Sequence, residues 1–130
     1  MVRVLFVCVH NSGRSQMAKA FFNALAINKG IADSAGTRPA TGINPTVIQV
    51  MHEVGIDISR EIPKLLTLEL VEQFDRMITM GCGVEETCPA GFLPTEDWGL
   101  DDPADKSIEE VRRIRDEIKT RVEKLVAELR

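Results

Sequence analysis

The sequence predicts an α/β fold: a three-layer, open, parallel four-stranded sheet with helices on both faces. Val2–Val7 is an almost unbroken β-favouring apolar run, as in a central strand buried on both sides. Strand-like and helix-like segments then alternate along the chain, which favours parallel strands joined by right-handed helical crossovers. The 130 residues suit one domain, residues 1–130. Because ligands bind beyond the carboxyl ends of such strands, we expect the site in the loops after the first, third and fourth strands.

The first half of the chain contains two strand–helix units. Apolar positions spaced three and four apart predict a one-sided helix between Arg14 and Asn28. Ile31–Ala35 is predicted as the second strand. Asn44 followed by Pro45 has the pattern of a cap residue and a proline in the first turn, so a helix is expected to begin there and to stop at Gly55.

The second half supplies the remaining elements. Thr67–Glu72 predicts a short helix, Phe74–Met80 the third strand and Phe92–Trp98 a weaker fourth strand. Ser107 with Glu110 three residues later forms a capping box at the start of a long terminal helix. The buried stripe predicted for that helix is Ile108, Val111, Ile114, Ile118, Val122, Leu125 and Leu129.

Composition and charge exclude several classes of protein. The net charge is -4 and no basic run is present, so nucleic acid is not an expected partner. No apolar stretch is long enough to span a bilayer and no signal peptide precedes the first strand, so no membrane partner is expected. Three cysteines without a CxxC pair suit neither a disulfide framework nor a closed zinc site. We expect a cytoplasmic monomer with no metal and no cofactor.

The loop after the first strand has the composition of an oxyanion cradle. It is rich in small residues and opens a helix, which gathers unpaired backbone N–H groups at the positive end of the helix dipole. Cys8 at its mouth is the candidate nucleophile, because this field stabilises a thiolate. The guanidinium of Arg14 suits two oxygens of a tetrahedral anion, and the Ser15 hydroxyl can hydrogen-bond the sulfur. The candidate substrate-binding residues are Val9, His10, Asn11, Ser12, Gly13, Arg14 and Ser15. The alternative is a buried core cysteine beside a solvated arginine.

These residues resemble a known family. The loop CVHNSGRS, the segments SAG at 34–36 and GIDIS at 55–59, and the stretch WGLDDP at 98–103 resemble the low-molecular-weight phosphotyrosine phosphatases, and more closely their thioredoxin-coupled arsenate reductase branch. The resemblance covers essentially the whole chain. It implies that Asp102 is the catalytic acid, whereas the residues alone favour Asp101 and Asp102 as a turn leading to the next helix.

The resemblance also implies a role for the other two cysteines. In the strand order of the family the third strand lies beside the first, about 4.8 Å away, so Cys82 just beyond the third strand would end near Cys8. Cys82 and Cys88 flank a short loop containing Gly83, which can bring two thiols within disulfide reach. A relay Cys8, Cys82, Cys88 would reduce arsenate to arsenite, with phosphate or sulfate as competing anions and thioredoxin as the reductant. Two incidental thiols are the alternative.

Other functions stay open at this point. A phosphatase of the same family hydrolyses phosphomonoesters through a phosphocysteine and needs only Cys8, Arg14 and Asp102, although this sequence has no tyrosine to wall an aromatic substrate. An oxyanion sensor would use the loop without turnover. The short spacing of Cys82 and Cys88 leaves glutathione or mycothiol as alternative reductants. Lys19 stands where relatives place a glutamate beside a potassium ion, so its ammonium is expected to take that place.

Overall fold

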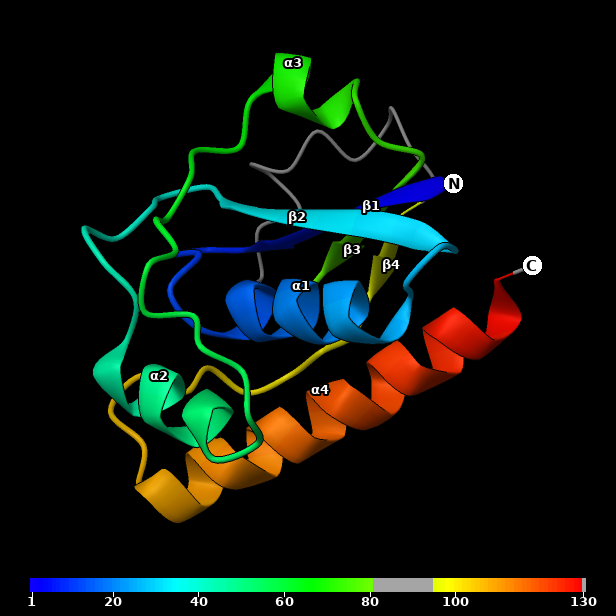
Figure 1. The fold of residues 1–130 in the computed structure, drawn as a ribbon. Helices are drawn as coiled ribbons and strands as arrows, with labels where there is room; N and C mark the ends of the chain where they lie inside the picture. The colour runs from blue at the N-terminus through cyan, green and yellow to red at the C-terminus, as the bar shows by residue number, and fades with distance from the viewer. Residues whose placement is uncertain (81–94, 130) are drawn as a thin grey trace.

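The computed structural model describes residues 1–80 and 95–129 and contains a four-stranded sheet in the order β2-β1-β3-β4 (Figure 1). The strands are β1 (Val2–Cys8), β2 (Gly30–Gly36), β3 (Arg76–Thr79) and β4 (Thr95–Asp97). Every neighbouring pair is parallel. The predicted parallel sheet, and the place of the third strand beside the first, are therefore confirmed.

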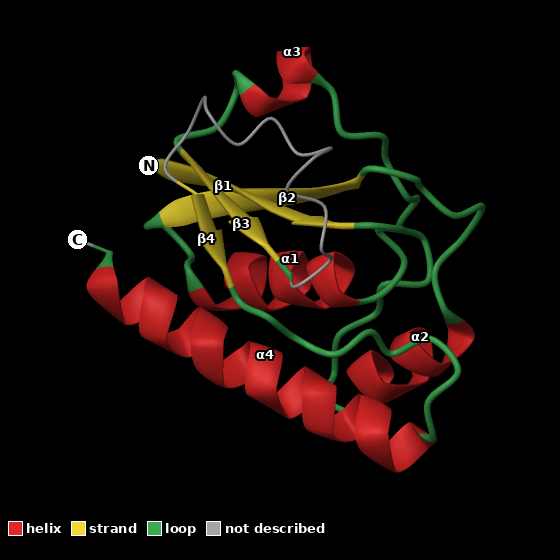
Figure 2. Ribbon diagram, turned by 180° about the vertical axis from the view of Figure 1, so that it is seen from behind, coloured by secondary structure: helices red, strands yellow, loops and turns green. Residues whose placement is uncertain are grey.

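The helices cover both faces of this sheet. They are α1 (Arg14–Leu25), α2 (Pro45–His52), α3 (Leu68–Val71) and α4 (Ile108–Glu128). Figures 1 and 2 show α1, α2 and α4 on one face and the short α3 on the other. The three-layer architecture predicted from the sequence is confirmed.

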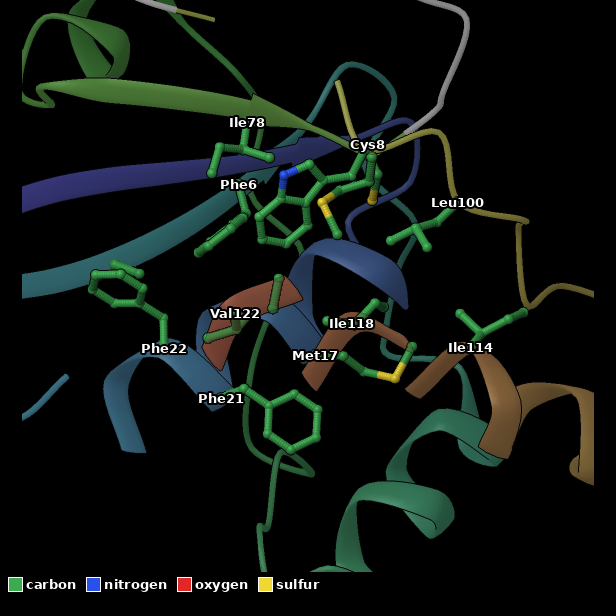
Figure 3. Packing of buried hydrophobic residues seen from close by; sticks show 14 of the residues in the cluster. Phe6, Cys8, Met17, Phe21, Phe22, Ile78, Leu100, Ile114, Ile118 and Val122 are labelled. Carbon is green, nitrogen blue, oxygen red and sulfur yellow. The ribbon is translucent and has the colours of Figure 1, made fainter. Parts of the chain in front are cut away.

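The alternation of side chains along β1 divides the core into two clusters. Val4, Phe6 and Cys8 face the layer of α1 and α4, whereas Leu5 and Val7 face α3. The side chains of Val4, Leu5, Phe6 and Val7 are fully buried, which explains the unbroken apolar run in the sequence. Figure 3 shows part of the larger cluster, in which the Phe6 ring packs against Phe22 at 6.1 Å and against Trp98 at 5.6 Å between centroids.

Side-chain caps begin two of the helices as predicted. The Asn44 side chain accepts a hydrogen bond from the Thr46 N–H at the start of α2, and Ser107 accepts one from the Glu110 N–H at the start of α4. The stripe on α4 is largely confirmed, since five of the seven predicted residues are buried and Ile108 and Leu129 are partly buried.

The first helix ends earlier than the sequence predicted. It stops at Leu25 rather than Asn28, because Asn28 adopts a left-handed backbone with φ of 68° that cannot continue a helix. The N–H groups of Lys29 and Gly30 both bond to the Ala26 carbonyl and close the turn. Leu25 in the last turn is 41% exposed, whereas Ala26 just beyond the helix is fully buried. In the described ranges, no helix has both the length and the apolar character needed to cross a membrane.

Candidate active site

The carboxyl ends of the strands meet at one edge of the sheet, where the candidate nucleophile lies. Cys8 is the last residue of β1 and pairs in register with Gly36 at the end of β2. Val7 pairs with Thr79 at the end of β3. The Cys8 side chain is 2% exposed and carries no disulfide. The edge predicted to hold the site is therefore formed by residues from three neighbouring strands.

The backbone carbonyl groups of the loop after β1 accept hydrogen bonds from the segment that follows β2. Those of Cys8 and Val9 accept hydrogen bonds from the N–H groups of Thr37 and Arg38. Those of His10 and Ser12 accept from Ala40 and Asn44 in the same way, at 3.0 and 2.9 Å. Because the C=O and N–H of a trans peptide point in opposite directions, outward carbonyls turn the following N–H groups to the inside of the loop. This is the arrangement that an oxyanion cradle requires.

Two donors are directed at the Cys8 sulfur. The Ser15 hydroxyl lies 2.8 Å from Sγ, and the Asn11 N–H lies 3.3 Å from it. The Asn11 side-chain amide donates to the Ser15 oxygen at 2.7 Å. Since Ser15 accepts that hydrogen bond, its own proton is free to point at the sulfur. When Cys8 is a thiolate, its sulfur can only accept, so the buried Ser15 hydroxyl then donates to it.

Asn11 connects the loop to the rest of the molecule. Its backbone is left-handed, with φ of 51°, a conformation that asparagine tolerates better than most residues. Its Oδ1 accepts from the Gln16 amide at 3.1 Å and from the Lys64 N–H at 2.9 Å. Gly36 lies directly against this loop, because a Cβ there would stand 2.6 Å from the Val9 carbonyl oxygen. The close approach requires glycine at the end of β2.

The Arg14 guanidinium is buried beneath the loop and held by two carbonyls. Its Nη1 donates to Met80 at 2.7 Å and to Leu100 at 2.9 Å, residues that follow β3 and β4. Arg14 is 5% exposed, which contradicts the alternative of a solvated arginine. Its Nη2 lies 3.8 Å from Asp102 Oδ2. One end of the fork is thus anchored, while the other end faces the carboxylate.

The segment after β4 carries Asp102 to the site and leaves Asp101 outside it. Pro103 is buried, and a Cβ on Gly13 would stand 2.7 Å from Pro103 Cγ, so the proline packs directly on the loop. The Ala104 N–H donates to Asp102 Oδ1 at 2.9 Å. Asp101 pairs instead with Arg113 on α4, at 3.3 Å. Of the two aspartates, Asp102 is therefore the one that lies beside Arg14.

Gly13→Ala is expected to destabilise the protein by about 1–3 kcal/mol, because the new methyl group overlaps Pro103 and must push its segment away. Urea unfolding followed by fluorescence of Trp98 would measure this change. Gly42→Ala is the matched control, since a Cβ at Gly42 meets no atom within 4 Å. Equal unfolding midpoints for the two variants would contradict the packing of Pro103 on the loop.

Other residues named from the sequence are placed as follows. Lys19 does not stand free: its ammonium contacts Glu61 at 2.6 Å and Asp33 at 3.5 Å. His10 is exposed and contacts the Arg38 carbonyl. Cys82 and Cys88 lie outside the described residues. Within residues 1–80 and 95–129, no group of three or more His, Cys, Asp or Glu side chains is arranged to hold a metal ion.

The sequence did not identify the supporting contacts of Gln16 and Lys64. Gln16 is 2% exposed, and its place in the first turn directly after the loop was the signal available for it. Lys64 contributes through its backbone N–H, and no local pattern reveals a contact between residues so far apart in the chain.

The chain is similar to known proteins over almost its whole length. The family model described as low molecular weight phosphotyrosine protein phosphatase matches residues 3–130. A putative arsenate reductase of Halobacterium salinarum is 40% identical over 122 residues, covering 90% of this chain and 85% of its relative.

Two solved structures also have this fold. An arsenate reductase in the phosphate-binding state has a TM-score of 0.88 and 38% identity, over 100% of both chains. A thioredoxin-dependent arsenate reductase of Corynebacterium glutamicum has a TM-score of 0.80 and 38% identity, covering 96% of this chain and 60% of the other. With the strand order, the Cys8 loop and these matches together, the chain belongs to the low molecular weight phosphotyrosine protein phosphatase family and is related to its arsenate reductases.

Proposed function

We propose that this protein reduces arsenate to arsenite, with Cys8 as the nucleophile. The observation that carries the proposal is the convergence on one oxyanion loop of a hydrogen-bonded sulfur, a buried arginine and a carboxyl group. Cys8 Sγ has Ser15 at 2.8 Å, and Arg14 Nη2 has Asp102 at 3.8 Å. Relatives named arsenate reductases, at about 40% identity over most of the chain, support the choice of substrate.

In the first step, the Cys8 thiolate attacks the arsenic atom of arsenate. The inward N–H groups of the loop and the Arg14 guanidinium hold the anion's oxygens, and an S–As bond forms. One arsenate oxygen departs as water, and Asp102 donates the proton that this oxygen needs. The arsenic is still As(V) in the resulting Cys8 adduct, so reduction requires a second thiol.

In the second step, Cys82 attacks the Cys8 sulfur. An S–S bond forms, the electron pair of the S–As bond stays with arsenic, and arsenite leaves as As(III). The end of β3 supports this role, because the Met80 N–H bonds to the Val7 carbonyl at 2.9 Å, directly beside Cys8. Cys82 follows Met80 by two residues, and two residues of chain span at most about 7 Å, so the proposed attack requires no long reach from the end of β3.

In the third step, Cys88 attacks Cys82, which releases the Cys8 thiolate and leaves a Cys82–Cys88 disulfide. An external dithiol must then reduce that disulfide to restore the enzyme. We propose thioredoxin, as in the related Corynebacterium glutamicum enzyme, with glutathione or mycothiol as the alternatives. Because free thiols persist in reducing compartments, the relay also favours a cytoplasmic location.

The second candidate function is hydrolysis of phosphomonoesters through a Cys8 phosphocysteine. The description of the matching family favours it, and the reaction needs only Cys8, Arg14 and Asp102. It leaves Cys82 and Cys88 without a role, and the sequence holds no tyrosine that could pack against the aromatic ring of a substrate. Arsenate with thioredoxin, thioredoxin reductase and NADPH, assayed in parallel with p-nitrophenyl phosphate, tests the two functions. Arsenate-dependent NADPH oxidation is expected; hydrolysis alone would overturn the proposal.

Asp102→Asn is expected to lower the turnover number for arsenate by roughly a hundredfold, because an amide cannot donate the proton that the departing oxygen requires. Asp101→Asn is the matched control, since Asp101 is exposed and pairs with Arg113 rather than Arg14. Steady-state kinetics and circular dichroism of both variants would measure the effect and confirm an intact fold. A hundredfold loss in Asp101→Asn with full activity in Asp102→Asn would reverse the assignment.

A further inference from the structure

A group of four charged side chains lies beside the Cys8 loop, on the side of α1 and β2. This group, the Asp33 cluster, consists of Lys19, Asp33, Glu61 and Lys64. The Lys19 ammonium contacts Glu61 at 2.6 Å and Asp33 Oδ1 at 3.5 Å. The Lys64 ammonium bonds to the other oxygen of Asp33. Asp33 therefore joins two cations that come from separate parts of the chain.

The cluster is connected to the nucleophile through the backbone of Lys64. The Lys64 N–H donates to Asn11 Oδ1 at 2.9 Å, and its carbonyl accepts from the Gly36 N–H at 2.8 Å. With Oδ1 held in this way, the amide nitrogen of Asn11 must point at Ser15, whose hydroxyl contacts the Cys8 sulfur. The Lys64 N–H, together with the Gln16 amide that also donates to Oδ1, thus sets the direction of the hydrogen bonds that end at Cys8.

Partial burial and the charge of Asp33 both favour ion pairs that keep one geometry. The Asp33 side chain is 25% exposed and that of Lys19 is 21% exposed, so the ion pair between them is partly shielded from water. Burial of the Asp33 carboxyl opposes its ionisation, but the Lys64 hydrogen bond, the Ser34 N–H and the two ammonium charges outweigh burial and lower its pKa. Asp33 accordingly stays charged at neutral pH.

We propose that Asp33 and Lys64 are positioning residues for Cys8. By tying the Lys64 side chain to β2, Asp33 keeps the Lys64 N–H on Asn11, and Asn11 in turn keeps the Ser15 hydroxyl directed at the sulfur. Neither residue contacts the Cys8 sulfur in the described part of the chain; both act through Asn11. The proposal rests on Cys8 being the nucleophile of the proposed function, but not on arsenate being the substrate.

The test compares Asp33→Asn and Lys64→Met, which remove one charge each and keep the backbone N–H. Both are made in a C82S/C88S background, so that Cys8 is the one remaining cysteine. The rate of alkylation by iodoacetamide at pH 6, divided by the rate at pH 9, is expected to fall about threefold to tenfold, as the Ser15 hydrogen bond to the sulfur loosens. Asp33→Glu and Lys64→Arg, which keep the charges, are expected to restore the ratio.

Glu53→Gln is the matched control. Glu53 also joins two cations, Arg112 at 2.7 Å and Arg115 at 2.9 Å, but these link α2 to α4 and do not contact the Cys8 loop. Its loss is expected to lower the melting temperature about as much as the loss of Asp33, with no change in the alkylation ratio. An unchanged ratio in Asp33→Asn and Lys64→Met would show that the cluster serves stability alone and would overturn the proposal.

A second measurement separates this proposal from the proposed function. In proteins that retain all the cysteines, Asp33→Asn and Lys64→Met are expected to lower kcat for arsenate about threefold to tenfold and to change KM by less than about twofold, since the Arg14 contacts to the anion are kept. If the unaltered protein does not reduce arsenate but the alkylation ratio still falls in the variants, the proposed function fails and the positioning role stands. A rise in KM with unchanged kcat would contradict the positioning role.

Discussion

Replacing Cys8 with serine is expected to abolish arsenate reduction and any hydrolysis of p-nitrophenyl phosphate, with a loss of roughly a thousandfold or more in each. The serine oxygen would occupy the sulfur's place beside Ser15 and Asn11, but a hydroxyl is a far weaker nucleophile than a thiolate at neutral pH. Both reactions begin with attack by this one atom, so both are lost together. NADPH oxidation and p-nitrophenol release measure the two losses.

The control for Cys8→Ser is the C82S/C88S double variant, which is expected to keep whatever hydrolysis the loop supports. In the unaltered protein, iodoacetamide at pH 6 is expected to label Cys8 before the other two cysteines, because Cys8 lies in the loop with Ser15 and the Asn11 N–H beside its sulfur. Peptide mapping identifies the labelled residue. Preferential labelling of Cys82 or Cys88, or arsenate reduction by Cys8→Ser, would contradict the assignment of the nucleophile.

Replacing Cys82 or Cys88 with serine is expected to stop multiple turnover at two different points. Cys82→Ser should release no arsenite, because the thiol that attacks the Cys8 sulfur, and so leaves the electron pair of the S–As bond on arsenic, is missing. Cys88→Ser should complete one turnover and then accumulate a Cys8–Cys82 disulfide, because the next attacking thiol is absent. Arsenite counted per enzyme, together with peptide mapping after one turnover, distinguishes the variants.

The two variants are controls for one another, since each removes one sulfur from the same short segment of the chain. Arsenite release by the native protein with Cys82 and Cys88 still reduced would mean that an external thiol resolves the adduct. That result would remove the relay and leave the Cys8 chemistry in place. Equal behaviour of Cys82→Ser and Cys88→Ser would contradict the order of the thiols.

The sequence allowed the fold to be predicted because its signals are local. The apolar run of β1, the cap at Asn44 and the cap at Ser107 each depend on neighbouring residues, and all three appear in the structure. The end of α1 was misplaced because the apolar spacing continues to Leu25 and beyond, whereas the left-handed turn at Asn28 depends on backbone conformation. Hydrophobic periodicity alone does not reveal that turn.

The candidate site was predictable where it is contiguous and not where it is assembled by the fold. The segment from Cys8 to Ser15 is one stretch of chain between a strand and a helix, so its composition indicates an anion site. The contacts of Arg14 with Met80 and Leu100 are long-range and go to backbone carbonyls, which any residue type provides. The link from Lys64 to Asn11 is hidden in the sequence for the same reason.

The anchored guanidinium of Arg14 has a consequence for the entropy of binding. A long arginine side chain loses roughly 2 kcal/mol of rotational freedom when it becomes fixed, and a flexible arginine would lose this at the moment an anion binds. In this protein the carbonyls of Met80 and Leu100 hold Nη1 before any anion binds. The rotational entropy of the Arg14 side chain is therefore lost when the protein folds and not when an anion binds. In the proposed reaction, binding of a tetrahedral anion would therefore require little further ordering of Arg14.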